Sequence, residues 1–327
     1  MKVILPLAGL GTRLRPHTFS RPKPLITVAG KPVLGHILDQ LAGLDISEIL
    51  YIIGHLGDQI VDYVGRHYPQ YPARFVEQRE LKGQAHALWL ASAYITEPVL
   101  IIFVDTLVEA DLRRVTATET DGVILVKEVE DPRRFGVAVL QDGYVQRLVE
   151  KPQTPVSNLA VVGVYYIRNY ELFLKCLGEL IDRGIMTGGE YYLADALQLM
   201  IGAGARLRAF PVEIWEDTGT VEALLQTNRY LLAHGHGRIE GELEHSVIVP
   251  PVYIARTARL INAVVGPNVS VDDGAVITNA IVREAIINEG ARVQNVLLTH
   301  SLIGNKADIQ GKMVRLNVGD YSQVATE

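Results

Sequence analysis

Residues Leu7–Pro16 read Leu-Ala-Gly-Leu-Gly-Thr-Arg-Leu-Arg-Pro. This stretch gives the first indication of the fold. It extends the apolar run Val3–Ala8, which we predict to be a buried β-strand. Glycines directly after such a strand permit a tight turn whose backbone N–H groups can approach a phosphate. Arg13 and Lys23 supply positive side chains near this turn. The chain therefore opens with a strand, a glycine-rich turn and a candidate anion site.

Two common phosphate-binding loops do not fit this turn. The dinucleotide fingerprint requires glycine where Leu14 stands and an acidic residue roughly 20 positions further on, in a region that has no acid. The Walker pattern requires Gly-Lys-Ser/Thr where the chain has Leu14-Arg15-Pro16. The turn therefore belongs to another class of anion-binding loop.

The charged residues at the start of the chain are all basic. No Asp or Glu occurs before Asp39, although acids outnumber bases overall and give the chain a net charge of −6. The basic residues of this segment are Lys2, Arg13, Arg15, Arg21, Lys23 and Lys31. Because charges more than about 8 Å apart across solvent are largely screened, local cations decide what a small site binds. We expect a small anionic ligand here, and the acidic total argues against a nucleic-acid-binding protein.

The composition is that of a globular protein long enough for two domains. The chain has 327 residues, of which 48% are hydrophobic and 21% charged. Its single cysteine, Cys176, excludes an intramolecular disulfide framework. No apolar run is long enough to cross a bilayer, and the first residues do not read as a signal peptide. We therefore expect a protein of the reducing cytoplasm with no membrane partner.

Strands and helices are predicted to alternate up to about residue 235. The predicted strands are Val3–Ala8, Ile49–Ile53, Ala73–Val76, Val99–Val104 and Gly122–Val129. The predicted helices are Val33–Leu41, Gln59–Tyr68, Gly83–Tyr94, Asn169–Asp182, Glu190–Gly202 and Thr220–Ala233. Asp142-Gly143 predicts a tight hairpin between Phe135–Leu140 and Tyr144–Val149. This alternation predicts an α/β domain over residues 1–235 with a mostly parallel, Rossmann-like sheet.

A repeat with a period of about six residues follows and predicts a second domain over residues 236–327. The repeated apolar positions include Ile248, Ile254, Leu260, Val271 and Ile277, with a one-residue slip near Val265. This period is typical of a parallel β-helix of about four coils, and an irregular β-rich tail is the alternative. Because an open last coil must be capped by the chain or by a neighbour, we expect a homo-oligomer formed through this domain. An acyltransferase activity of the β-helix would rest on analogy of fold alone.

The turn and the segments after it resemble a known family. GxGTRLxPxT followed by PKPL is the signature of sugar-1-phosphate nucleotidyltransferases, and Gly9–Thr18 and Pro22–Leu25 match it almost letter for letter. The resemblance continues in order through Gln78, Gly83, Asp105, Gly136, Glu150-Lys151-Pro152, Gly163-Val164-Tyr165, Gly189-Glu190 and Trp215–Thr220. Within the family, the chain is most similar to the long form of the glucose-1-phosphate thymidylyltransferases. The resemblance implies a glycosyltransferase-A-like catalytic sheet and a left-handed β-helix.

The reaction of this family is a transfer between two anions. A phosphate oxygen of a sugar 1-phosphate attacks the α-phosphorus of a nucleoside triphosphate, so catalysis depends on positioning and charge neutralisation rather than on a protein nucleophile. Arg13 can bind the pyrophosphate leaving group with its forked guanidinium. The resemblance implies that Lys23 faces the α-phosphate and Lys151 the sugar phosphate. Arg13 and Lys23 are therefore the expected catalytic residues.

The resemblance also implies the binding residues. The expected nucleotide-binding residues are Leu7, Ala8, Gly9, Gly11, Thr12, Arg13, Gln78 and Gly83. The expected sugar-phosphate-binding residues are Gly136, Glu150, Lys151, Gly163 and Glu190. The residues alone leave other interpretations open: a solvated hairpin end for Lys151, a helix-start charge for Glu190 and a solvated loop side chain for Gln78.

Two carboxylates suggest a metal site. Asp105 ends the apolar strand Val99–Val104, and ligands of open α/β sheets bind beyond the carboxyl ends of the strands. An unpaired carboxylate is costly at such a place, which favours a metal ligand. Asp217 offers a second carboxylate, although Asp-Thr-Gly can also be a helix cap before Val221. Two carboxylates and phosphate oxygens suit Mg²⁺, which is the expected cofactor.

The favoured reaction joins dTTP and glucose 1-phosphate to give dTDP-glucose and pyrophosphate. The alternatives are the same chemistry with UTP, GTP or another sugar 1-phosphate, and a catalytically silent relative that binds nucleotide sugars. The sequence departs from the usual family pattern at Val104-Asp105-Thr106 and at Gly83-Gln84-Ala85-His86-Ala87. These departures leave the choice between thymidine and uridine open.

Overall fold

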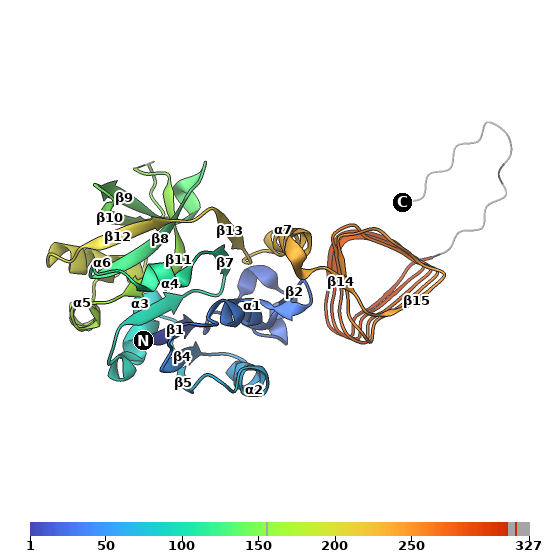
Figure 1. Ribbon diagram of the computed structural model, residues 1–327, viewed down its shortest axis with the longest axis horizontal. Helices are drawn as coiled ribbons and strands as arrows, with labels where there is room; N and C mark the ends of the chain where they lie inside the picture. Colours follow the sequence, from blue (N-terminus) through green and yellow to red (C-terminus); the bar gives the residue numbers. More distant parts are fainter. Residues whose placement is uncertain (155, 313–317, 319–327) are drawn as a thin grey trace. The chain divides into compact units, whose positions relative to one another are not determined.

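The computed structural model describes residues 1–154, 156–312 and 318, and Figure 1 shows its ribbon. The chain divides into two compact units: the first contains Met1–Thr27 and Lys31–Thr227, and the second contains Val28–Gly30 and the chain from Asn228 onward. The end of the predicted C-terminal domain, residues 313–317 and 319–327, lies outside the described residues. Among the helices described, none has the length and apolarity that crossing a membrane requires.

The first unit is built on a nine-stranded mixed sheet with the order β5-β4-β1-β6-β11-β8-β12-β10-β9. The strands are β1 (Lys2–Pro6), β4 (Glu48–Ile53), β5 (Ala73–Glu77), β6 (Val99–Ile102), β8 (Gly122–Glu128), β9 (Gly136–Gln141), β10 (Tyr144–Glu150), β11 (Leu159–Ile167) and β12 (Leu207–Pro211). The predicted alternation correctly describes β5, β4, β1 and β6, which are parallel neighbours. Strand β11, which was not predicted, runs antiparallel to β6 and β8 and makes the sheet mixed.

Helices lie between the strands and, except for α4, close to where the apolar spacing predicts them. They are α1 (Val33–Gln40), α2 (Gly57–His67), α3 (Gln84–Leu90), α4 (Leu112–Thr116), α5 (Tyr170–Asp182), α6 (Leu193–Gly202) and α7 (Val221–Leu231). Helix α6 begins at Leu193 rather than at Glu190, because Tyr192 has an extended backbone and Glu190 forms a bridge with Thr187. Helix α3 ends at Leu90, and a 3-10 turn, Ser92–Tyr94, completes the predicted span.

The main core lies between the sheet and helices α3, α5 and α6. Leu88, Phe173 and Leu197, one from each helix, are fully buried against apolar residues of the central strands. Cys176 belongs to the same cluster, and burial raises the pKa of its thiol. It is therefore a small buried apolar residue, as its apolar surroundings in the sequence indicate.

A separate two-stranded sheet lies just beyond the end of β6. It pairs β7 (Thr106–Glu109) with β13 (Ile214–Asp217) in antiparallel register, with Asp217 opposite Thr106. The backbone N–H of Thr218 also donates to the carbonyl oxygen of Asp105 over 2.9 Å. These contacts bring two segments about a hundred residues apart to the same edge of the main sheet.

The second unit is a parallel β-helix whose short strands stack coil upon coil (Figure 1). Two columns of strands share the long strands β22 (Ile281–Ile287) and β24 (Leu297–Ile303). One column also contains β14 (Arg238–Ile239), β17 (Val252–Ile254) and β20 (Val269–Val271), and the second also contains β16 (Val247–Ile248) and β19 (Val264–Val265). A third column contains β15 (Glu242–Glu244), β18 (Arg259–Ile261), β21 (Val276–Thr278), β23 (Arg292–Gln294) and β25 (Asp308–Gln310). The predicted repeat therefore forms the expected fold.

The coils are slightly shorter than three perfect hexapeptides. Equivalent asparagines at one corner, Asn262, Asn279 and Asn295, are separated by 17 and then 16 residues, and the side-chain amide of each of the first two donates a hydrogen bond to Oδ1 of the next. The one-residue slip in the sequence pattern is this shortening. The interior is filled by apolar residues such as Val265 and Val282, which have no exposed surface.

Candidate active site

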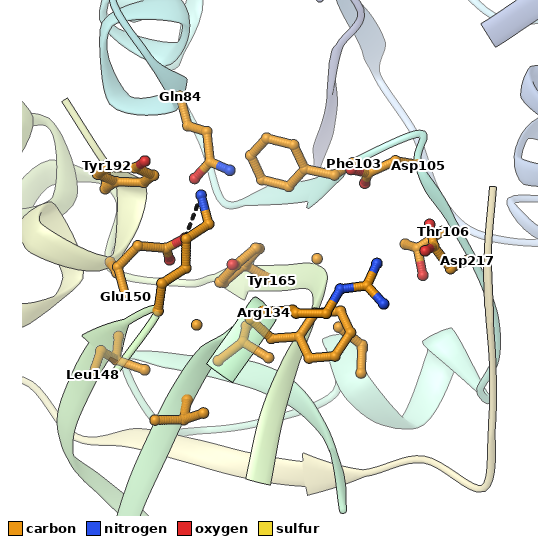
Figure 2. Close-up of a pocket in the computed structure, with 18 of the residues that line it drawn as sticks. Gln84, Phe103, Asp105, Thr106, Arg134, Leu148, Glu150, Tyr165, Tyr192 and Asp217 are labelled. Carbon is orange, nitrogen blue, oxygen red and sulfur yellow. Dashed lines mark ion pairs between the residues drawn. The ribbon is translucent and has the colours of Figure 1, made fainter. Parts of the chain in front are cut away.

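Two adjoining cavities lie at the carboxyl ends of β1 and β6 in the first unit. The larger has a volume of about 680 Å³ and the smaller about 310 Å³. They share the lining residues Gln84, Phe103, Asp105 and Glu190. In Figure 2, Glu150 and Tyr192 lie at one end of the larger cavity, and Asp105, Thr106 and Asp217 lie at the other.

Most of the predicted site residues line one of these cavities. Leu7, Ala8, Gly9, Lys23, Gln78 and Gly83 line the smaller cavity. Thr12, Arg13, Gly136, Glu150, Lys151, Gly163 and Asp217 line the larger, and Asp105 and Glu190 line both. Gly11 lines neither. Gly11 has a φ of 61°, and a Cβ added to it would lie only 3.0 Å from the Cβ of Lys23. The glycine therefore lets the lysine pack against the turn.

Lys23 is the buried cation of the site. Its Nζ lies 3.8 Å from Oδ2 of Asp105, and its side chain is 14% exposed. Burial lowers the pKa of Lys23, whereas Asp105 and Asp217 act in the opposite direction and Arg13 adds to the lowering. A lysine in this position is poised to meet an additional anion, because the two carboxylates only partly compensate the cost of its burial.

The guanidinium of Arg13 lies beside the segment that contains Asp217 and Gly219. A Cβ added to Gly219 would lie 2.9 Å from Nη2 of Arg13 and 2.9 Å from Oδ1 of Asp217. The absence of a side chain at Gly219 therefore makes room for both groups. Asp217 accepts a 2.7 Å hydrogen bond from the Gly219 N–H. The N-terminal cap of α7 is Thr220, whose hydroxyl accepts from the Ala223 N–H. Asp217 is therefore not the helix cap that the sequence allowed as an alternative.

Gln78 and Gly83 form one wall of the smaller cavity. Gln78 is 6% exposed, so it is not a solvated loop side chain. Gly83 has a φ of 103°, and a Cβ there would lie 2.6 Å from the carbonyl oxygen of Tyr191. The glycine is thus required by the backbone of Tyr191, which accepts from Ala85 N–H and donates to Lys82.

Glu150 and Lys151 lie at the far end of the larger cavity. Gly136 is opposite Glu150 in the β9–β10 register, and a Cβ there would lie 2.8 Å from Oε2 of the carboxylate. Burial raises the pKa of Glu150 despite the nearby Lys151 ammonium, which lies 3.6 Å from Oε1. Lys151 is 56% exposed and its ammonium lies over the ring of Tyr192. It is both a hairpin end and a cavity cation.

Several cavity residues were not predicted from the sequence. They include Gln84, Arg134, Phe135, Tyr165, Tyr192 and Trp215. The rings of Phe135 and Trp215 meet edge to face with centroids 4.8 Å apart, which joins the β9 hairpin to β13. The run Asp131-Pro132-Arg133-Arg134 was the only sequence signal for Arg134, and it did not indicate the side chain's direction.

The residues present fit a hard divalent cation. Asp105 and Asp217 line the same cavity, and Asp105 is 52% exposed although it follows a buried strand. In the described part of the chain, no group of three or more His, Cys, Asp or Glu side chains could hold a metal. A pair of carboxylates suits Mg²⁺, which usually keeps several waters and completes its coordination with substrate phosphates.

A family model described as "Nucleotidyl transferase" matches residues 2–234, and one described as "GlmU-like, C-terminal hexapeptide" matches residues 226–294. The chain belongs to the nucleotidyl transferase family. This nucleotidyltransferase combines the family's catalytic domain with a hexapeptide β-helix.

Curated relatives of this nucleotidyltransferase carry different names. It is 36% identical to the bifunctional protein GlmU of Methanocaldococcus jannaschii over 76% of the chain, but spans only 59% of that protein. It is 34% identical to a glucose-1-phosphate thymidylyltransferase of Streptomyces antibioticus, covering 82% of this chain and 77% of the relative. It is 32% identical to the UTP–glucose-1-phosphate uridylyltransferase AglF of Haloferax volcanii, covering 69% and 97%.

Proposed function

We propose that this nucleotidyltransferase transfers a nucleoside monophosphate unit from a nucleoside triphosphate to a sugar 1-phosphate and releases pyrophosphate. The observation that carries the proposal is the meeting of the two cavities at Asp105. One cavity is lined by the glycine turn and Gln78, and the other by Glu150 and Lys151. Two anionic substrates bound in them would face each other beside Lys23.

The chemical step needs no group of the protein to form a covalent bond. A phosphate oxygen of the sugar 1-phosphate forms a bond to the α-phosphorus, and the bond from the α-phosphorus to the bridging oxygen breaks. The electron pair leaves on pyrophosphate. Lys23 would stabilise charge on the α-phosphate, and Arg13 would bind the pyrophosphate as it departs.

The remaining residues orient the substrates. Lys151 would neutralise the sugar phosphate, while Glu150 and Glu190 would accept hydrogen bonds from sugar hydroxyls. Asp105 and Asp217 would hold Mg²⁺, which when bound would neutralise phosphate charge. Holding both substrates in line accounts for a large part of the rate of such transfers.

We propose dTTP and glucose 1-phosphate as the favoured substrates, with UTP as the alternative nucleotide. Relatives named for thymidylyl and for uridylyl transfer have similar identity to this chain, which supports a pyrimidine with a ring N–H. A catalytically silent relative is disfavoured, because Arg13, Lys23, Asp105 and Asp217 are all present around one site.

Pyrophosphate release tests this function. Purified protein with Mg²⁺ is incubated with each pair from a grid of dTTP, UTP, GTP and CTP against glucose, N-acetylglucosamine and mannose 1-phosphates. The proposal predicts the fastest release with dTTP and glucose 1-phosphate. Release with no pair would overturn the enzyme proposal, and fastest release with GTP and mannose 1-phosphate would overturn the substrate assignment.

We also propose that the β-helix forms a homo-oligomer. Four apolar residues, Val247, Val264, Ile281 and Leu297, occupy equivalent outward positions in successive coils. Leu297 is 70% and Val247 58% exposed. The same row on a second copy would cover these four apolar residues, which we call the apolar ladder.

The cytoplasm is the compartment that we propose for this protein.

A further inference from the structure

The side-chain amide of Gln78 is held on one edge by two groups of the protein. Its Nε2 lies 3.3 Å from the carbonyl oxygen of Gly83 and 3.3 Å from Nδ1 of His86. A backbone carbonyl can only accept a hydrogen bond, so the amide nitrogen rather than the oxygen must face Gly83. The backbone N–H of Gln78 donates to Ile53 over 2.8 Å and fixes the base of the side chain.

His86 can act as the second acceptor. A neutral imidazole that carries its proton on Nε2 accepts through Nδ1, whereas an imidazolium has no acceptor. Burial lowers the pKa of His86, with a further lowering from Lys82 and an opposing effect of Glu80, so the ring is neutral near pH 7. These are the charged groups that act on the ring, and they form an ion pair with each other.

The position of His86 is itself fixed. It lies in the first turn of α3, directly after the loop that is clamped to Tyr191 by hydrogen bonds from Ala85 and to Lys82. The close approach of Gly83 to the Tyr191 backbone leaves this loop little freedom. The histidine ring therefore meets the Gln78 amide in a defined place.

The two acceptors can use both hydrogens of the Gln78 amide nitrogen. Within the described residues, no protein group donates a hydrogen bond to the amide oxygen Oε1. Because Gln78 lines the smaller cavity, Oε1 is the amide atom left for a ligand there. An acceptor oxygen favours a base with a ring N–H at its pairing edge, and disfavours cytosine, whose N3 is also an acceptor.

We propose that His86 is a positioning residue, which fixes the Gln78 amide so that its oxygen meets the base and selects uracil or thymine over cytosine. This inference rests on the proposed nucleotide site in the smaller cavity. His86 acts through Gln78 and needs no contact with the nucleotide. Without an acceptor at residue 86, only the Gly83 carbonyl would hold the amide nitrogen, so a rotation that presents this nitrogen to N3 of cytosine would cost less.

The test compares His86→Leu with His86→Asn. Asparagine carries Oδ1 where histidine carries Nδ1, so it restores the acceptor, whereas leucine supplies volume without one. The readout is the ratio of kcat/KM for UTP to that for CTP, with the KM of the sugar 1-phosphate measured alongside. His67→Leu is the matched control, because the ring of this α2 histidine lies 4.7 Å from that of Tyr63, centroid to centroid.

We expect His86→Leu to lower the UTP/CTP ratio roughly tenfold, the size of one hydrogen bond, through the KM of the triphosphate. His86→Asn and His67→Leu should keep the ratio within about threefold of wild type. The wild-type ratio should also fall as acid protonates His86, below the usual histidine pKa, while the ratio of His86→Asn stays flat. A role of His86 in packing alone would not make the base selection of the wild type depend on pH.

Unchanged base selection in His86→Leu would overturn the inference, as would equal loss in the leucine and asparagine variants. Should His86→Leu not fold, the pH dependence of wild type and His86→Asn decides: a wild-type ratio that is flat in acid overturns the proposal. Calorimetric binding of UTP and CTP separates this inference from the proposed function. If the wild type binds neither nucleotide, the proposed function is wrong. If it prefers UTP equally at every pH, only the proposed role of His86 is wrong.

Discussion

The ammonium of Lys23 lies 3.8 Å from the carboxylate of Asp105, and the lysine is the more buried of the two. The pair joins the 3-10 turn Lys23–Leu25, which packs against the glycine turn, to the end of β6, the parallel neighbour of β1 in the sheet. At this separation, opposite charges near a protein surface attract by roughly 4 kcal/mol at an effective dielectric near 20. The carboxylate opposes the lowering of the Lys23 pKa by burial, at the place where two anionic substrates would meet.

Replacing Lys23 should therefore affect turnover more than stability. Lys23→Met keeps most of the side-chain volume and removes the charge, so kcat/KM should fall roughly 10²–10³-fold, as for other groups that stabilise charge in a transition state. Thermal unfolding should change little, because the cost of burying the charge is lost together with the ion pair. The exposed Lys175→Met is the control. A turnover within twofold of wild type would remove Lys23 from catalysis.

Asp105→Asn should leave the fold intact and abolish the turnover that depends on Mg²⁺. The asparagine has nearly the same shape but no negative charge for a cation. Circular dichroism and a Mg²⁺ titration of pyrophosphate release measure the two effects. The exposed helix residue Asp62 gives the matched variant Asp62→Asn, which should behave like wild type. If Asp105→Asn keeps the wild-type Mg²⁺ response, the carboxylate is not a metal ligand.

The structure contains pairings that the sequence could not reveal. The glycine turn and the acid at the end of β6 were predictable, because each depends on residues that are neighbours in the chain. The pairing of Thr106 with Asp217 depends on a register between β7 and β13 that no local pattern encodes. For the same reason, Arg134 and Trp215 were not predicted to line the cavity.

The β-helix shows the same limit. Its repeat was visible because each coil repeats the same inward positions. Residues Val28–Gly30 belong to this unit although they lie far away in the sequence: Ala29 N–H donates to Oδ1 of Asn228, which also accepts from Ser270. A three-residue segment has no periodicity, so only the packing identifies it.

Gly30→Ala should destabilise the second unit. Gly30 has a φ of 75°, and a Cβ there would lie 2.0 Å from the ring of Tyr253. Gly184→Ala is the matched control, because its φ is 62° and nothing lies within 4 Å of the added carbon. The control should cost about 1 kcal/mol from backbone strain alone, and Gly30→Ala a further 1–3 kcal/mol or so from overpacking. Equal losses in denaturant unfolding would contradict the packing of Tyr253 on Gly30.

Stability should depend on the protonation of Glu48. Burial alone would raise the pKa of Glu48, but hydrogen bonds from Lys2 and Arg74 outweigh burial and lower it below the ordinary glutamate value. The folded state therefore binds the proton less readily than the unfolded state. The contribution to stability is complete above the unfolded pKa and is lost as the pH falls through the folded pKa.

Glu48→Gln provides the comparison for this pH effect. The variant should be less stable than wild type at neutral pH, and the difference should shrink in acid below the ordinary glutamate pKa. Chemical denaturation across that range measures it. A difference that is constant with pH would show that Glu48 contributes through shape rather than charge.

Leu297→Lys should weaken the proposed assembly. The substitution places a charge in the row formed by Val247, Val264, Ile281 and Leu297, where a second copy would have to desolvate it. Sedimentation should show a smaller species for Leu297→Lys than for wild type at the same concentration. Val61→Lys, at an exposed apolar residue of α2, should sediment like wild type. A monomeric wild type would contradict the proposed role of the apolar ladder.

Exchange of labelled pyrophosphate into the nucleoside triphosphate tests whether the protein transfers the nucleotide directly to the sugar phosphate. In the proposed mechanism, a sugar phosphate oxygen attacks the α-phosphorus in one step, with no nucleotide attached to the protein. Exchange should therefore require sugar 1-phosphate in the mixture and stop when it is omitted. Exchange in the absence of sugar 1-phosphate, or no exchange in either mixture, would contradict this direct transfer.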